Sequence, residues 1–296
     1  MLTLFSTPKA FAGHFDVIQK NAIRSWARLP GVELILFGRD AGTAEMAAES
    51  GARHVPAVPT NEFGTPLLSA MFAQAAADAK NELVMYVNAD VIMLPDAIRT
   101  IARVRAWRPD FLLVGRRTDL DVDTPIDFRN RAWMEELAAR ARHDGVLQAP
   151  EWIDYFAFPR HAAPVLPPFA VGRPGWDNWL MWNARTRGVP VVDATAAILA
   201  IHQNHDYSHV AGGKTGATHR VEAAQNNELI GTWARMFTID DCNYVATATG
   251  VRRNTSLRYF ARRLEILRRR TIDWTRPLRR RVGWRALNKT WKPDQS

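Results

Sequence analysis

The first 115 residues alternate between short apolar runs and segments with apolar residues at helical spacing. This alternation constrains the fold more than any other feature of the chain. The strand-like runs are 2–6, 32–38, 52–58, 83–87 and 111–115, and the helical patterns between them are 15–29, 43–50, 65–80 and 95–106. Strands that alternate with helices favour a parallel sheet covered on both faces. We therefore predict an α/β fold with a mixed, mostly parallel sheet and flanking helices.

The pattern after residue 115 is less regular. Helices are expected over 130–142 and 178–187, with strands over 155–158, 189–192 and 196–201. Pro66 can open the helix of 65–80 as an early helical residue, because proline is tolerated in a first turn. The chain has no internal repeat, and its composition shifts once, near residue 250.

Asn88-Ala89-Asp90 directly follows the continuous apolar run 83–87, which is typical of a central strand buried on both faces. In open α/β sheets, ligands bind beyond the carboxyl ends of the strands. Asp90 and the neighbouring oxygen donor of Asn88 suit a hard divalent cation shared with substrate phosphates. The alternative is an ordinary aspartate that caps the turn after a strand.

Four histidines lie between positions 202 and 219. One of them could supply an imidazole to the same metal, since imidazole also binds Mn²⁺-like ions in mixed oxygen and nitrogen sites. A zinc site is the rival interpretation, but the spacing matches no zinc motif and cysteine partners are absent from the sequence. A surface or hydrogen-bonding role remains open for each histidine.

Asp177 follows the Gly/Pro-rich loop 172–175 and begins a predicted helix. Its carboxylate can cap that helix or act as a general base toward an attacking hydroxyl. Trp176 and Trp179 flank it. Aromatic faces of this kind often support sugar rings, although packing in the core is the alternative for at least one of them.

Over residues 1–215, the order of these features resembles the GT-A glycosyltransferases, especially the family 2-like branch. The positions that carry the resemblance are Phe5-Ser6-Thr7-Pro8, Asp40, Asn88-Ala89-Asp90, Gly172 to Gly175, Trp176-Asp177 and His202. Two of them depart from the family pattern. Asn88 stands where the first aspartate of the metal motif is expected, and Trp176 stands where glutamate often precedes the catalytic aspartate.

The resemblance implies a metal-dependent, inverting transfer of a sugar from a nucleoside diphosphate sugar, expected to be a UDP-sugar. Mn²⁺ or Mg²⁺ would be held by Asp90 and His202, with His205 as the alternative ligand, and Asp177 would be the catalytic base. The acceptor would be a hydroxyl of a glycan or a lipid-linked glycan of the cell envelope. The implied contacts to the nucleotide sugar are Ser6, Thr7, Pro8, Asp40, Asn61, Asn88, Ala89 and Asp90, and those to the acceptor or sugar are Gly175, Trp176 and Trp179.

Two other functions fit the same alternation of strands and helices. A sugar-phosphate nucleotidyltransferase usually carries a Gly-rich, basic loop after its first strand, and residues 6–11 lack that loop. A non-catalytic carbohydrate or membrane adaptor could also keep the fold.

The net charge of +9 belongs to the end of the chain, where residues 252–296 carry 15 Lys/Arg against 3 Asp/Glu. We predict a catalytic domain over 1–250 and a basic helical extension over 251–296. Apolar and aromatic residues interleave with the arginines, a pattern that suits an anionic membrane surface. Packing on the domain is the alternative. The acidic-leaning remainder and the lack of a recognised motif argue against nucleic acid.

The sequence contains no apolar run long enough to span a bilayer, and its N-terminus enters a strand-like run with no leader-like segment. The single cysteine, Cys242, excludes an intrachain disulfide and agrees with a reducing compartment. We expect a cytoplasmic protein that works peripherally on the inner face of the cell membrane.

Overall fold

The computed structural model describes residues 1–205 and 217–268, with the backbone alone described for 217–220. A nine-stranded sheet with the order β13-β12-β10-β6-β9-β4-β1-β2-β3 forms the centre. Its strands are β1 (Leu2–Ser6), β2 (Val32–Phe37), β3 (Arg53–Val55), β4 (Leu83–Val87), β6 (Leu112–Arg116), β9 (Ile153–Pro159), β10 (Val191–Asp193), β12 (Tyr244–Ala246) and β13 (Val251–Arg253). Pairing is parallel except on both sides of β9 and between β12 and β13.

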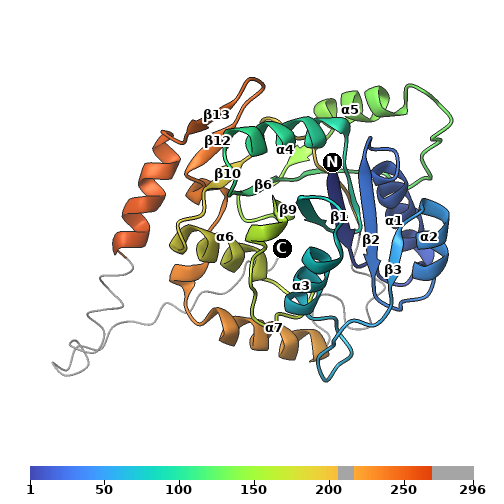
Figure 1. Cartoon of the computed structure of the whole chain (residues 1–296), viewed down its shortest axis with the longest axis horizontal. Helices are drawn as coiled ribbons and strands as arrows, with labels where there is room; N and C mark the ends of the chain where they lie inside the picture. The colour runs from blue at the N-terminus through green and yellow to red at the C-terminus, as the bar shows by residue number, and fades with distance from the viewer. Residues whose placement is uncertain (206–216, 269–296) are drawn as a thin grey trace.

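Helices cover both faces of this sheet (Figure 1). One hydrophobic core packs the sheet against α1 (Gly13–Trp26), α2 (Thr43–Ser50), α4 (Pro95–Trp107) and α5 (Trp133–His143). The other packs it against α3 (Leu68–Asp78), α6 (Trp176–Thr186) and the end of α7 (Ala217–Ile230). Alternate residues of β4 enter the two cores, Met85 the first and Tyr86 the second, because successive strand side chains point to opposite faces.

A second, four-stranded sheet stands where the central strands end. Its order is β5-β11-β7-β8, formed by β5 (Val91–Ile92), β11 (Ile201–Gln203), β7 (Thr118–Leu120) and β8 (Val146–Leu147). β5 follows β4 after the turn at 88–90, and β7 follows β6 almost directly. The register pairs His202 with Val91 on one side and with Asp119 on the other. This small sheet therefore brings the late histidine segment to the end of β4.

The predicted α/β fold, with a mixed, mostly parallel sheet and flanking helices, is confirmed. Most predicted elements differ from the observed ones by a few residues at their ends, and three differences have a clear origin. α3 begins at Leu68 because Pro66 and Leu67 form isolated bridges with Thr60 and Ala170. The strand expected over 196–201 forms only at Ile201–Gln203, since the backbone from Ala194 to Ile198 makes a turn. Sequence periodicity did not indicate α7.

The end of the described chain continues the fold. β13 pairs with β12 at the edge of the sheet, and a helix occupies 257–268. Three short 3-10 turns complete the described elements, at Arg160–Ala162, Trp233–Arg235 and Ile239–Asp241. The division at residue 250 stays a prediction, and most of the expected extension, 269–296, lies outside the described residues. In the described part of the chain, we find no helix with the length and apolar character needed to cross a bilayer.

Candidate active site

The turn after β4 is fixed by hydrogen bonds on every side of Asn88. Its amide Nδ2 donates to Asp154 Oδ1 at 2.7 Å, and its Oδ1 accepts from the Tyr86 hydroxyl at 2.9 Å. The backbone N–H of Asn88 donates to the carbonyl of Asp154 at 2.9 Å. Because both ends of the side-chain amide are engaged, the geometry favours Asn88 as a residue that positions the turn.

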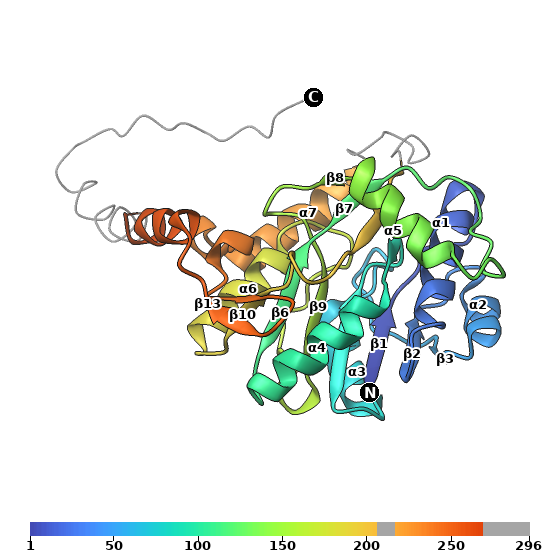
Figure 2. The ribbon, with the colours of Figure 1, turned by 90° about the horizontal axis from the view of Figure 1, so that it is seen from above.

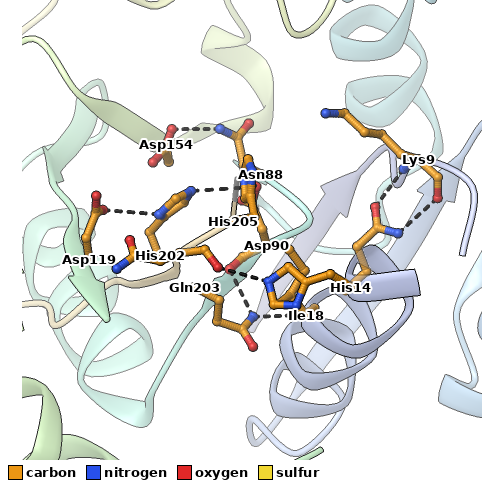
Figure 3. Close-up of polar contacts among 12 residues, drawn as sticks. Lys9, His14, Ile18, Asn88, Asp90, Asp119, Asp154, His202, Gln203 and His205 are labelled. Atoms are coloured by element: carbon orange, nitrogen blue, oxygen red, sulfur yellow. Dashed lines mark hydrogen bonds and ion pairs between the residues drawn. The ribbon is translucent and has the colours of Figure 1, made fainter. Parts of the chain in front are cut away.

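Asp90, two residues further on, lies beside two histidines from the end of β11 (Figure 3). Its Oδ2 is 3.7 Å from His202 Nε2 and 3.3 Å from His205 Nε2. One ligand atom from each of the three residues can be chosen so that all lie within 4.8 Å of one another. Asp90 Oδ1 is buried and has no hydrogen-bond partner. One carboxylate and two imidazoles fit the predicted Mn²⁺ or Mg²⁺, and the unsatisfied oxygen is the atom that such an ion would neutralise.

Asp119 sets the orientation of His202. The Nδ1 of His202 lies 3.1 Å from Asp119 Oδ1, on the side of the ring opposite Nε2. A carboxylate at one ring nitrogen directs the other nitrogen toward a metal and makes it more basic. Gln203, the next residue, is fully buried, and its Nε2 donates to the carbonyls of Ile18 and Asp90. The small sheet thus holds the imidazole and the aspartate in register.

Arg117 neutralises part of the acidic cluster. Its guanidinium contacts Asp154 and Asp119, each at 2.8 Å, and packs over the ring of Trp152 with 4.7 Å to the centroid. Burial would lower the pKa of Arg117, but these carboxylates outweigh it and raise the pKa above its ordinary value. Arg117 therefore stays charged and links the turn of Asn88 to the support of His202.

Replacing Arg117 by Ala is expected to cost about 3–5 kcal/mol of unfolding free energy, because it leaves two inward-facing carboxylates without their counter-charge. Arg117 is only 12% exposed, so solvent cannot take over this role. Denaturant unfolding at neutral pH measures the effect. Arg129→Ala, at an ion pair whose arginine is 93% exposed, is the control and should change stability by less than about 1 kcal/mol.

Neighbouring charges shift the pKa values of Asp90 and His202, and in both cases the shift is opposite to the effect of burial. Burial raises the pKa of Asp90, but the hydrogen bond from His205 and the charges of His202 and Arg117 hold it well below its usual range. Burial lowers the pKa of His202, and the carboxylates of Asp119 and Asp90 more than reverse this. Asp90 is therefore anionic near neutral pH, as a metal ligand must be.

Asp177 lies in the first turn of α6, after Gly175, whose φ of 94° is in the left-handed region. Burial raises the pKa of Asp177 to about 7, the nearby charge of Asp154 adds to the rise, and backbone amides at the helix start reduce it in part. Asp177 Oδ1 is buried and has no hydrogen-bond partner. This carboxyl can exchange a proton near neutral pH, as the role of general base requires.

Tyr86 lies between Trp176 and the turn of Asn88, to whose Oδ1 its hydroxyl donates. Asp90, Asp154 and Asp177 all raise the pKa of its hydroxyl, after the larger effect of burial. Its ring packs edge-on against Trp176, the residue before Asp177, with centroids 5.4 Å apart. Asp177 thus follows a residue that packs on β4, and the turn that carries Asp90 follows the same strand.

Trp176 and Trp179, predicted to contact the acceptor or sugar, both lie in the hydrophobic core. They are 6% and 8% exposed, and Trp179 packs on Phe169 and Trp182. At Gly175, an added Cβ would come within 2.5 Å of Ile230 Cδ1 on α7. Trp176, Trp179 and Gly175 therefore pack the start of α6 against the core and α7. Their contact with acceptor or sugar stays a prediction.

The remaining residues predicted to contact the nucleotide sugar lie in three different surroundings. Ser6 and Thr7 donate to the carbonyls of Val87 and Phe37 and so tie the end of β1 to its neighbouring strands, and Pro8 is buried. Asp40 and Ala89 are at least partly exposed at this same end of the sheet, and their contact with a nucleotide stays a prediction. Asn61 has another partner, since its Nδ2 donates to Glu222 Oε1 at 2.6 Å.

Glu222 joins three segments that are far apart in sequence. It is fully buried on α7, where it accepts from Asn61 and from two nitrogens of Arg173, at 2.9 and 2.5 Å. Arg173 belongs to the Gly/Pro-rich loop before Asp177. The buried ion pair therefore attaches α7 to the loop that precedes the predicted base.

Lys9 extends from the loop after β1 toward the Asp90-His202-His205 cluster (Figure 3). The buried side chain of Gln19 holds its backbone, accepting from Lys9 N–H at 2.7 Å and donating to its carbonyl at 2.9 Å. The ammonium lies over the ring of Phe15, 4.7 Å from the centroid, and forms no ion pair with a carboxylate in the described part of the chain. Burial and the nearby Arg173 lower its pKa, and Asp90 opposes them.

Several residues of the site were not singled out from the sequence, among them Asp154, Asp119, Lys9, Arg117 and Glu222. Asp154 had a recognisable signal, since it is a charged residue in the otherwise apolar strand Ile153–Pro159. Asp119 stood in an acidic stretch to which no role was assigned. Lys9, Arg117 and Glu222 had no local signal, because their role depends on which distant carboxylates or cations they face.

No family model matches the sequence, and no curated protein matches it. The fold is similar to solved structures of glucosyl-3-phosphoglycerate synthase from Mycobacterium tuberculosis. Its complex with Mg²⁺ and uridine-diphosphate gives a TM-score of 0.46 at 18% identity, covering 78% of this chain and 79% of that chain. Its complex with Mn²⁺, uridine-diphosphate and glucosyl-3-phosphoglycerate gives 0.45 at 20% identity, covering 78% and 80%. A likeness of this size is coarse, so we base the function on the residues of this chain.

Proposed function

We propose that this protein is a GT-A glycosyltransferase that moves a sugar from a nucleoside diphosphate sugar, expected to be a UDP-sugar, to a hydroxyl acceptor. One observation carries the proposal. The Asp90-His202-His205 cluster, which fits a divalent cation, includes the turn after β4, and Asp177 follows Trp176, whose ring packs on Tyr86 of the same strand. Burial raises the pKa of Asp177 to about 7. A transferase of this class needs both groups within reach of one sugar.

On the donor side, Asp90 and the two histidines would hold the cation. Bound there, Mn²⁺ or Mg²⁺ would neutralise charge that builds on the leaving diphosphate. Lys9 faces the cluster from the loop after β1 without a carboxylate of its own, so we assign its ammonium to a diphosphate oxygen. Asn88, held by Tyr86 and Asp154, would keep the turn in place while the donor binds.

On the acceptor side, Asp177 would take the proton of the attacking hydroxyl. Burial raises the pKa of Asp177 to about 7, so its carboxylate is a stronger base than that of an ordinary aspartate. A single carboxylate acting as base favours inversion at the anomeric carbon. We further propose a glycan or lipid-linked glycan acceptor, and a cytoplasmic enzyme that works at the inner face of the membrane.

A panel of nucleotide sugars, incubated with the full chain and Mn²⁺ in the absence of acceptor, tests the reaction class. Slow release of a nucleoside diphosphate from one donor supports the proposal. Formation of nucleotide sugar from nucleoside triphosphate and sugar phosphate, with release of pyrophosphate, would identify a nucleotidyltransferase. No turnover and no nucleotide binding would leave the adaptor as the better assignment.

The role of Lys9 gives a separate prediction. Lys9→Gln is expected to weaken binding of UDP with Mn²⁺ by about tenfold, since a charge-assisted hydrogen bond contributes about 1.5–3 kcal/mol. Binding of uridine, which lacks phosphate, should not change. Isothermal titration measures both, with Lys20→Gln, at a surface ion pair on α1, as control. Equal loss for UDP and uridine would contradict a phosphate contact.

A further inference from the structure

The helix over 257–268 is attached to the body of the protein by one of its faces. Arg262 Nε donates to Asp241 Oδ2 at 3.0 Å, and Arg262 Nη2 donates to the carbonyl of Met236 at 2.8 Å. Asp241 is 1% exposed at its side chain, and Ile266, one turn beyond Arg262, is 6% exposed in the core around α6. A buried charge pair and a buried aliphatic side chain fix the rotation of this helix about its axis.

The opposite face of the helix is apolar and exposed. Leu257, Phe260 and Leu264 are 87%, 51% and 68% exposed. Their spacing of three and four residues places them in one stripe, because an α-helix turns once in 3.6 residues. The same periodicity puts Arg262 and Ile266 on the other side. Leu267, 55% exposed, lies on the stripe side as well, so four of the twelve exposed large apolar residues in the described chain fall on these three turns.

Positive charge surrounds this stripe. Arg252 and Arg253 on β13 and Arg258 and Arg263 on the helix are exposed. The one acidic residue of the helix, Glu265, is bonded to Arg262. The sequence that follows, 269–296, adds nine Lys/Arg against two Asp/Glu. An apolar helical stripe bordered by arginine is the composition of a helix that lies in the interface of an anionic bilayer, with aliphatic groups among the acyl chains and arginine at the headgroups.

We propose that the exposed face of the helix over 257–268, centred on Leu257, Phe260 and Leu264, docks this protein on a membrane that contains anionic lipids. The helix stands at the edge of the molecule beside β12 and β13 in both views, drawn in orange-red at the left (Figures 1 and 2), so a flat surface can approach it. A second copy is a poorer partner, because pairing two such stripes would oppose like charges. Binding of nucleic acid would account for the arginines but not for the exposed apolar stripe.

Vesicle flotation of the full chain tests this surface and does not depend on the reaction. Binding to vesicles of phosphatidylcholine and phosphatidylglycerol at 70:30 is expected, with little binding to phosphatidylcholine alone and weakening at high salt. The triple variant Leu257→Ser/Phe260→Ser/Leu264→Ser should lower the partition coefficient by about tenfold or more, since burial of each apolar side chain in the interface is favourable. All three side chains are exposed, so thermal melting should be unchanged.

The matched control, Val146→Ser/Val165→Ser, removes side chains that are 60% and 71% exposed elsewhere and should bind vesicles as the unaltered chain does. Arg263→Glu should weaken binding to anionic vesicles, while Arg129→Glu should not. Failure of the unaltered chain to bind anionic vesicles would overturn the proposal. So would a triple variant that binds them fully, or one whose only change is from dimer to monomer in sedimentation, which would identify a self-association surface instead.

Discussion

Replacing Asp90 by Ala is expected to abolish the metal-dependent part of nucleoside diphosphate binding, with a loss of at least about 100-fold in affinity at saturating Mn²⁺. Asp90 is the only carboxylate of the Asp90-His202-His205 cluster. Both histidines lower its pKa and so favour its charged form. Without it, two imidazoles remain, and these bind a hard cation poorly. Titration of UDP with and without Mn²⁺ measures the effect, and Mn²⁺ electron paramagnetic resonance measures the metal directly.

Two variants make the result for Asp90 specific. Asp127→Ala removes a carboxylate that is 59% exposed, and it should leave metal binding unchanged. Asp119→Asn should weaken Mn²⁺ by a smaller factor, about tenfold to 100-fold, because Asp119 orients His202 rather than touching the ion. If Asp90→Ala retained full Mn²⁺-stimulated binding, the ion would have to lie elsewhere and the assignment of this cluster would be wrong.

The fold could be predicted from periodicity because the strands of the large sheet in the first half of the chain, β1, β2, β3, β4 and β6, each carry their own signal. β4 is a continuous apolar run whose bounds, Leu83–Val87, were predicted to the residue, and α2 was predicted equally well. α7 escaped prediction because two of the three buried side chains described on it are polar. Glu222 and Asn226 face inward and are satisfied by Asn61, Arg173 and Ala170, and such partners are visible only after folding.

The candidate site divides in the same way. The turn at Asn88-Ala89-Asp90 could be proposed because a strand end locates it, and His202 because it begins the histidine-rich segment beside the predicted late strand, although it lies within β11. Lys9 and Arg117 could not, because a cation acquires a role only from the carboxylates that tertiary structure places around it. The sequence left both a contact with acceptor or sugar and core packing open for Trp176. Its side chain packs against Tyr86 in the core, and the contact with acceptor or sugar stays a prediction.

Replacing Asp177 by Asn is expected to lower the rate of transfer by about 10²–10⁴-fold while leaving Mn²⁺ and UDP binding within about twofold, since the change removes the base and keeps the shape of the side chain. In the unaltered protein, kcat/KM should fall as pH decreases below about 7, because the carboxylate is the active form and its pKa is raised to about 7. Asp177→Asn should lose this limb of the profile. Single-turnover assays from pH 5.5 to 8.5 measure both.

Stability gives an independent readout of the same group. The pKa of Asp177 is higher in the folded chain than in the unfolded chain, so the folded state binds the extra proton, and stability falls as pH rises from about 4 to about 7. Above that pH, the buried carboxylate is ionised and destabilises the folded state, whereas the neutral amide of Asn does not. Asp177→Asn should therefore raise Tm by roughly 3–6 °C at pH 8 and by less at pH 5.

Asp123→Asn, at an exposed aspartate, is the control and should change neither the rate nor the pH dependence of Tm. A variant at Asp177 that lost activity with no altered pH dependence of Tm would mean that the carboxyl is not buried as described. A variant that gained stability at pH 8 but kept full turnover would assign the proton of the acceptor to another carboxylate, such as Asp154, whose Oδ1 lies 2.7 Å from the amide of Asn88.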